Sequence, residues 1–144
     1  MSSSRALAVL LAVGAPAIAQ EQPHAFGCPA TIAVIESATA APPWHAEASP
    51  ATDHKFLRPS IYNGTPGGKE YELAPDNEKS GGKRVRQEWN LSAYRDMNLF
   101  LRCRYAGTEV TAVADIPASL KTCEFTFRNV PGNQPVASPS FECR

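Results

Sequence analysis

The fold is decided by residues 84–105, which read RVRQEWNLSAYRDMNLFLRCRY. Residues 84–91 and residues 99–105 both alternate between apolar and polar side chains with a period of two. This period is typical of β-strands that bury one face and expose the other. The side chains expected on the buried faces are Val85, Gln87, Trp89 and Leu91 in the first strand and Leu99, Leu101, Cys103 and Tyr105 in the second.

The short connection between these two runs predicts that they pair as antiparallel neighbours. A slip of one residue would send core side chains to water, so the register is constrained. Pairing Trp89 with Leu101 keeps both side chains in the core, and it brings Glu88 opposite Arg102 on the other face. That face is then a predicted arginine surface, which consists of Arg84, Arg86, Arg102 and Arg104.

Short strands joined by well-marked loops are expected in the rest of the chain. Its thirteen prolines interrupt helices and interior strands. The fold class that we expect is all-β, with at most a short helical turn: an antiparallel sheet folded into a small sandwich or open barrel. Pro59 makes one of the strands an edge strand, and loops are expected at 38–55 and 75–82. Further strands are predicted at residues 31–35, 56–62, 69–73, 109–116, 123–130 and 140–143.

The N-terminus has the pattern of a secretory signal peptide. Arg5 precedes an apolar run over residues 6–15, and Ala17-Ile18-Ala19 forms a small-x-small cleavage site. The run is about half of the roughly 20 residues that cross a bilayer, so it predicts cleavage and no membrane span. We therefore expect a periplasmic or secreted protein. Its expected organisation is a signal peptide at 1–19, a flexible leader at 20–27 and a single β-rich domain at 28–144.

Four cysteines follow the predicted cut, and an oxidising compartment favours two disulfides among them. Cys123 and Cys143 are equidistant from Asn133, the centre of the last turn, so a simple hairpin places them opposite each other. This scheme leaves Cys28 with Cys103. The alternative joins Cys103 to Cys123 and leaves Cys28 with Cys143. The spacing favours the first scheme, and the absence of a C-x-x-C pair argues against zinc.

A series of short motifs runs along nearly the whole mature chain. They are Cys28-Pro29-Ala30-Thr31-Ile32, Trp44, Trp89 in a polar strand, Cys103-Arg104-Tyr105-Ala106-Gly107-Thr108, Ile116-Pro117 and Cys143-Arg144. In this order and spacing they resemble a family of small exported proteobacterial proteins without an assigned activity. The resemblance implies export and a disulfide-bonded β-rich domain, and it supplies no catalytic residues to carry over.

Composition and motifs narrow the class of function. Fourteen basic residues balance fourteen acidic ones, and loss of Arg5 with the signal peptide leaves a net charge of −1, which does not indicate nucleic acid as a partner. No nucleophile-elbow, zinc-protease or phosphate-loop motif is present. We therefore expect a monomeric, non-enzymatic binding module without a cofactor, of the inhibitor or immunity type, for an envelope protein or an anionic glycan. The alternative is a small-ligand or metal carrier, and a hydrolase ranks after it.

The candidate partner-binding residues are the arginine surface and Trp44. Arginine suits bidentate capture of carboxylate or phosphate groups, which predicts an anionic partner. The alternative for the arginines is a solvated sheet face, and for Trp44 it is packing of a proline-rich loop onto the core. No metal site is expected, because the spacings of His24, His45 and His54 match no known ligand motif.

Overall fold

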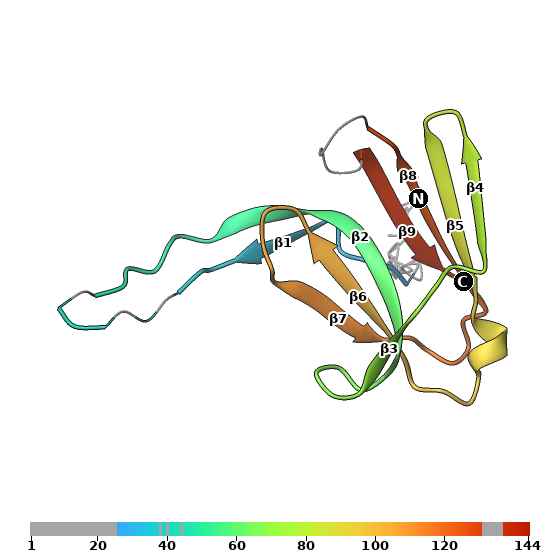
Figure 1. Cartoon of the computed structure of the whole chain (residues 1–144), viewed down its shortest axis with the longest axis horizontal. Coiled ribbons are helices and arrows are strands. Elements are labelled where there is room, and N and C mark those ends of the chain that lie inside the picture. Colours follow the sequence, from blue (N-terminus) through green and yellow to red (C-terminus); the bar gives the residue numbers. More distant parts are fainter. Residues whose placement is uncertain (1–25, 38, 40, 44, 131–136) are drawn as a thin grey trace, which may run out of the picture.

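The computed structural model describes residues 26–37, 39, 41–43, 45–130 and 137–144 of the 144-residue chain (Figure 1). Within these residues the chain forms nine strands and one short 3₁₀ helix, η1 (Leu91–Tyr94). The strands are β1 (Thr31–Val34), β2 (Thr52–Gly64), β3 (Glu70–Leu73), β4 (Asn77–Gly81), β5 (Arg84–Asn90), β6 (Leu99–Tyr105), β7 (Thr111–Asp115), β8 (Thr122–Arg128) and β9 (Ala137–Cys143). The predicted signal peptide and most of the predicted leader lie outside the described residues.

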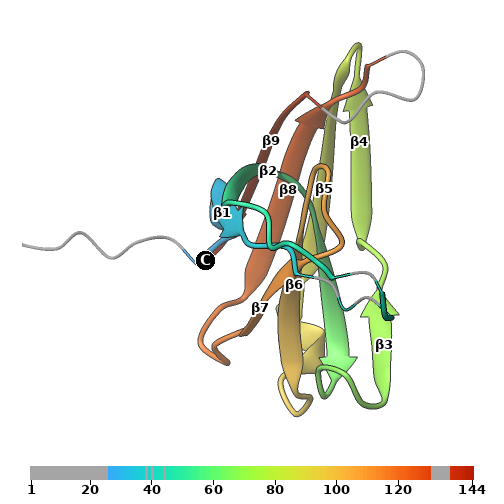
Figure 2. The same ribbon diagram turned by 90° about the vertical axis from the view of Figure 1, so that its left-hand side faces the viewer.

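The strands form two antiparallel sheets with a shared core (Figures 1 and 2). One sheet has the order β1-β2-β6-β7, with β3 paired to part of β2, and the other has the order β4-β5-β8-β9. Ile61 and Leu101 from the first sheet and Trp89, Phe125 and Phe141 from the second belong to one buried cluster. The all-β, antiparallel fold class expected from the sequence is confirmed.

The predicted pairing of residues 84–91 with residues 99–105 is wrong. β5 pairs with β8, where Trp89 lies opposite Cys123, whereas β6 pairs with β2 and β7 in the other sheet. The 3₁₀ helix η1 separates β5 from β6, and Leu91 within it is only 3% exposed. Because η1 buries Leu91 in the core, the chain passes from one sheet to the other and does not fold back as a hairpin.

The strand that contains Pro59 is not an edge strand. Residues 56–62 lie within β2, which pairs with β6 on one side and with β1 and β3 on the other. The pairing with β1 ends at Lys55, and the pairing with β3 begins at Ile61. Pro59 therefore falls in a gap where β2 has one strand neighbour, and proline is tolerated there for the same reason as at an edge.

A strand also replaces part of the loop predicted at residues 75–82. β4 pairs with β5 along its whole length, and a two-residue turn with Gly82 at φ 61° connects them. All five residues of β4 are exposed. Apolar alternation does not signal this strand, because both of its faces are exposed; backbone pairing and a hydrogen bond from Gln87 to Glu78 hold it to β5.

The two disulfides join Cys28 to Cys103 and Cys123 to Cys143. The first pairing scheme is therefore confirmed, and the alternative scheme is wrong. Cys123 and Cys143 lie directly opposite each other on β8 and β9, as the position of the last turn predicts. The other bridge attaches the segment before β1 to the middle of the five-stranded sheet.

Candidate functional site

The four residues of the predicted arginine surface do not share one face. Arg84 and Arg86 lie on β5, while Arg102 and Arg104 lie on β6, and these strands belong to different sheets. The prediction of a single arginine surface assumed that these two strands pair. Because they do not pair, the four arginines do not form one surface. Trp44, the other candidate, lies outside the described residues.

Arg102 is held by an internal ion pair. Its Nη1 and Nη2 atoms donate to the two carboxylate oxygens of Glu70 at 3.1 and 2.8 Å. Its guanidinium also lies 4.7 Å from the ring centroid of Tyr62 and 5.5 Å from that of Phe100. The hydrogen bond from Arg102 lowers the pKa of Glu70, and the same bond raises the pKa of Arg102. These contacts fasten the start of β3 to the outer surface of its sheet.

Arg104 faces another arginine. It lies opposite Arg58 on β2 and opposite Thr111 on β7. The Nε atom of Arg104 is buried and has no hydrogen-bond partner among the described residues. This pair forms a small cationic spot on the five-stranded sheet, apart from the arginines of β5.

The outer face of the four-stranded sheet carries a continuous set of polar side chains, which we call the polar face. Strand alternation directs Trp89, Phe125 and Phe141 into the core and their neighbours outward. The polar face consists of Asn77 and Lys79 on β4, Arg84, Arg86, Glu88 and Asn90 on β5, Thr122, Glu124, Thr126 and Arg128 on β8, and Ser140 and Glu142 on β9.

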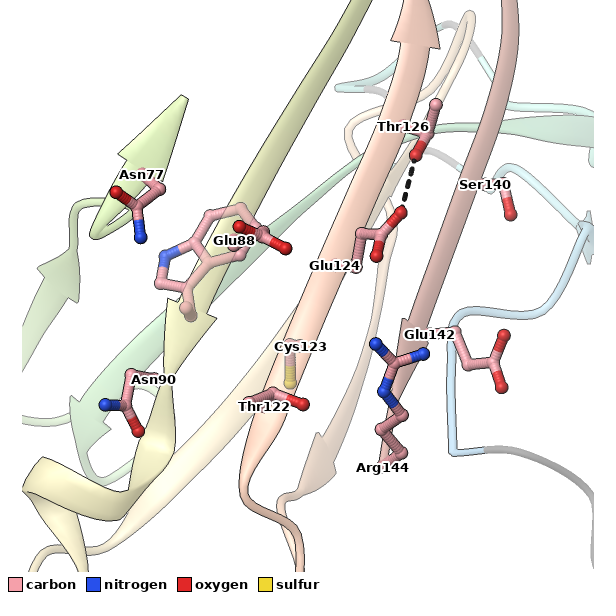
Figure 3. A pocket seen from close by; sticks show the side chains of 11 residues that line it. Asn77, Glu88, Asn90, Thr122, Cys123, Glu124, Thr126, Ser140, Glu142 and Arg144 are labelled. Carbon is pink, nitrogen blue, oxygen red and sulfur yellow. Dashed lines mark hydrogen bonds between the residues drawn. The ribbon is translucent and has the colours of Figure 1, made fainter. Parts of the chain in front are cut away.

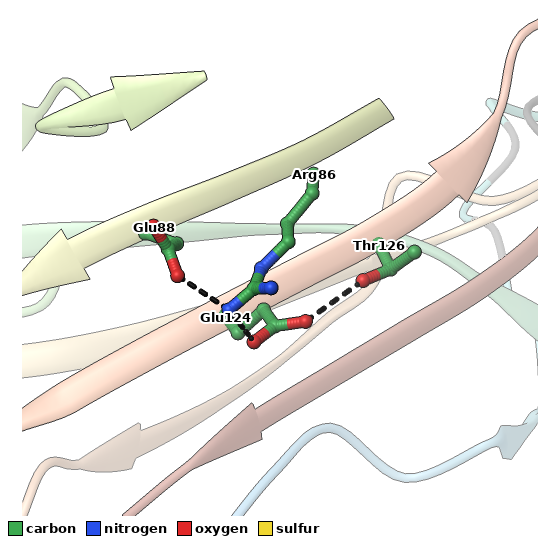
Figure 4. A network of polar contacts seen from close by, with 4 residues as sticks. All are labelled: Arg86, Glu88, Glu124 and Thr126. Carbon is green, nitrogen blue, oxygen red and sulfur yellow. Dashed lines mark hydrogen bonds and ion pairs between the residues drawn. The ribbon is translucent and has the colours of Figure 1, made fainter. Parts of the chain in front are cut away.

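A row of three carboxylates crosses the polar face. Glu88 lies opposite Glu124, and Glu124 lies opposite Glu142. Like charges in such positions on neighbouring strands are destabilising. Arg86 relieves part of the repulsion, because its Nη2 atom lies 2.5 Å from Oε1 of Glu88 and 2.8 Å from Oε2 of Glu124 (Figure 4). Oε1 of Glu124 also accepts a hydrogen bond from Thr126 at 3.2 Å.

A polar hollow of about 370 Å³ lies over this carboxylate row (Figure 3). Glu142 is exposed and makes no ion pair with any described residue. Arg86 therefore pairs with Glu88 and Glu124, whereas Glu142 has no ion pair among the described residues and shares the hollow with Arg144 (Figure 3). The other polar residues that line the hollow are Asn77, Asn90, Thr122, Thr126, Ser140 and Arg144.

The opposite end of the polar face carries positive charge. Arg84 lies opposite Arg128, and Lys79 lies opposite Arg86. Lys83 in the β4–β5 turn adds a further cation. We call Lys79, Lys83, Arg84 and Arg128 the cationic end, and none of the four makes an ion pair within the described part of the chain. A second hollow, of about 500 Å³, is lined by Gly81, Lys83, Arg84, Thr126, Phe127, Arg128, Ser138 and Ser140.

The sequence analysis predicted neither the carboxylate row nor the cationic end, although the sequence contains a signal for part of the carboxylate row. The hairpin that places Cys123 opposite Cys143 also places Glu124 opposite Glu142, because both pairs are centred on Asn133. The third carboxylate and the pairing of Arg84 with Arg128 depend on β5 lying beside β8. Those strands are far apart in the sequence, and no local pattern relates them.

The histidines do not gather into a metal site in the part of the chain that the structure describes. Nδ1 of His54 lies 2.8 Å from the carbonyl oxygen of Ala106, His45 is exposed, and His24 lies outside the described residues. No three histidine, cysteine or acidic side chains among the described residues are placed to hold a metal ion. The groups on the polar face are suited to ion pairs and hydrogen bonds with a macromolecular surface.

Comparison with known proteins identifies the family. The model of the type VI secretion system Tli immunity protein family matches residues 49–144, a range that contains β2 to β9. The chain belongs to the Tli immunity protein family. An uncharacterized 16.3 kDa protein in the trpG 5′ region of Azospirillum brasilense is 30% identical over 146 residues, which cover 94% of this chain and 93% of that protein. No solved structure matches the chain significantly.

Membership of the Tli immunity family confirms the expected inhibitor- or immunity-type binding protein. The uncharacterized Azospirillum protein agrees with the resemblance to small bacterial proteins without an assigned activity. The helices found among the described residues include none that is long and apolar enough to span a bilayer.

Proposed function

We propose that this protein neutralises a type VI secretion effector by binding it, without chemistry of its own. The observation that carries the proposal is the immunity-family match over residues 49–144, because this range contains every strand of the polar face. Neutralisation by binding requires a pre-organised surface whose polar groups need little ordering when the partner arrives. Regular strand pairing and the Cys123–Cys143 bridge support such a surface here.

We place this interaction in the periplasm. Residues 1–19 have the pattern of a signal peptide that is cut after Ala19, and residues 20–27 form a leader before a single domain at 28–144. Two disulfides are suited to an oxidising compartment. An immunity protein in that compartment meets an effector that is delivered into the cell envelope.

Co-expression in a heterologous bacterium tests both parts of the proposal. Each type VI effector of the same organism is directed in turn to the periplasm of the host, alone or together with the full-length protein. We expect the full-length protein to restore growth. A matched variant that lacks residues 2–19 should not protect, because it stays in the cytoplasm. Expression of each form without the effector controls for effects on the host.

A binding measurement separates neutralisation by binding from neutralisation by chemistry. Purified mature protein and a non-toxic variant of the same effector should co-elute as one complex in size-exclusion chromatography. Restored growth without a detectable complex would contradict a binding mechanism. Equal protection by the forms with and without residues 2–19 would contradict a periplasmic site of action.

A further inference from the structure

The cationic end of the polar face gathers positive charge at a cost in stability. Arg84 and Arg128 lie directly opposite each other on β5 and β8, and both are exposed. Like charges directly opposite each other destabilise a sheet. Folding alone therefore does not explain why two arginines occupy these paired positions.

The described residues give the cationic end no carboxylate partner. Residues 129–136, which connect β8 to β9, read NVPGNQPV and contain no acidic residue. The β4–β5 turn adds Gly82 and Lys83, the second of which is another cation. Arg102 shows the contrast, because its charge is matched by both carboxylate oxygens of Glu70. Arg86 and Arg102 each have a carboxylate partner, whereas Arg84 and Arg128 have none among the described residues.

The hollow at the cationic end is suited to carboxylates. Arg84 and Arg128 line it, and each guanidinium can bind a carboxylate with two parallel hydrogen bonds. Ser138 and Ser140 line the same hollow and carry hydroxyl donors, while the hydroxyl of Thr126 already donates to Glu124. The hollow also adjoins the one over the carboxylate row, because Thr126 and Ser140 line both.

The carboxylate row limits what can dock at the cationic end. Glu88 follows Arg84 by four residues, which is about 13 Å along an extended strand. Glu124 precedes Arg128 by the same spacing on the neighbouring strand. A continuous polyanion that ran along the strands from Arg84 and Arg128 would reach the carboxylate row and be repelled. A short acidic segment on a folded protein would end before the carboxylate row.

We infer that the effector docks on the cationic end of the polar face through an acidic segment of its own surface, with its aspartates or glutamates paired to Arg84 and Arg128. This inference rests on the proposed function and adds the chemistry of the contact. It also changes the binding residues that were predicted for an anionic partner. Arg84 remains in the site, and Lys79, Lys83 and Arg128 are added. Arg102 is removed because it is ion-paired with Glu70.

Paired substitutions test the inference with purified mature protein and a non-toxic variant of the effector that it neutralises in the growth assay. In the double variant Arg84→Gln with Arg128→Gln, we expect the Kd to rise at least about tenfold, as for the loss of close interfacial charge pairs. Raising NaCl from about 50 to about 300 mM should slow association of the wild-type protein more than that of the variant.

The chain offers a matched control on its other sheet. Arg58→Gln with Arg104→Gln also removes a cross-strand arginine pair, and it should leave the Kd unchanged. Arg84→Lys with Arg128→Lys keeps both charges and should lose less affinity than the glutamine pair. The urea midpoint of each variant shows that it is folded.

The outcomes separate the docking site from the function. An unchanged Kd in the Arg84–Arg128 glutamine variant, or equal weakening in the Arg58–Arg104 control, would overturn the docking site and leave neutralisation by binding intact. Failure of the wild-type protein to bind the effector would instead refute the proposed function, and the docking site with it.

Discussion

Removal of the Cys28–Cys103 disulfide should destabilise the protein more than removal of the Cys123–Cys143 disulfide. The bridges span sequence separations of 75 and 20 residues. A cross-link stabilises the folded state by restricting the unfolded chain, and the restriction grows with the loop that it closes. For loops of these lengths the chain-entropy model predicts contributions of about 4.5 and about 3.3 kcal/mol at 25 °C.

The surrounding structure acts in the same direction. Cys123 and Cys143 are paired residues on adjacent strands, and Phe125 opposite Phe141 continues that pairing. The two strands therefore remain neighbours when their bridge is absent. Cys28 precedes β1, which pairs with β2, while its disulfide partner lies on β6. Loss of this bridge removes the covalent link between the N-terminal segment and the centre of the five-stranded sheet.

Urea titration followed by tryptophan fluorescence measures the difference. The oxidised wild-type protein is compared with Cys28→Ala/Cys103→Ala and with Cys123→Ala/Cys143→Ala, and mass spectrometry verifies the remaining bridge in each variant. We expect the free energy of unfolding to fall by about 1 kcal/mol more in the first variant than in the second. Cys28 is only partly buried, whereas Cys123 and Cys143 are both buried, so the cavity cost is larger in the second variant and works against the expected order. Equal losses, or a larger loss in the second variant, would refute the reasoning from loop length.

Three further substitutions test particular contacts. Glu70→Gln should lower the urea midpoint at pH 7, because the hydrogen bond from Arg102 lowers the pKa of Glu70 from its usual 4.5. The difference in midpoint from wild type should shrink as the pH falls from 4.5 through this lowered pKa, and a difference that is constant at all pH values would contradict the role of the ion pair. Leu101→Ala should cost about 2–5 kcal/mol of unfolding free energy because Leu101 is 1% exposed, while Val113→Ala, at a residue 43% exposed, should stay within about 0.5 kcal/mol in the same titration. Gly64→Ala should cost more than about 1 kcal/mol, because Gly64 has φ 128° and a Cβ there would collide with the carbonyl oxygen of Lys69. Its control, Gly81→Ala, has open space around the added Cβ and should show little change in thermal midpoint.

Local patterns in the sequence predicted the strands and their buried faces well. Alternation correctly placed Trp89, Leu101 and Cys103 in the core, because it follows directly from the geometry of an extended chain. The centre of the last turn predicted the Cys123–Cys143 bridge, because a hairpin pairs residues equidistant from its turn. The exposed strand β4 was missed, because it carries no apolar alternation.

The candidate site was harder to predict than the elements that build it. Arg84 and Arg86 were correctly assigned to an outward face, but their neighbours were wrong. The prediction placed them beside β6, and the structure places them beside β8, where Arg128 and Glu124 meet them. A correct list of outward-facing residues therefore led to an incorrect surface.

The sequence by itself determined the side-chain directions in β5 and β6, the last hairpin and, through that hairpin, one of the two disulfides and the opposition of Glu124 and Glu142. Only the tertiary structure decided which distant strands are neighbours, and so which charges share a face. The physical reason is that side-chain direction and hairpin register follow from the backbone within a few residues. The neighbours of β5 depend instead on how the whole chain buries its apolar area, beginning with Leu91 at the crossing between the sheets.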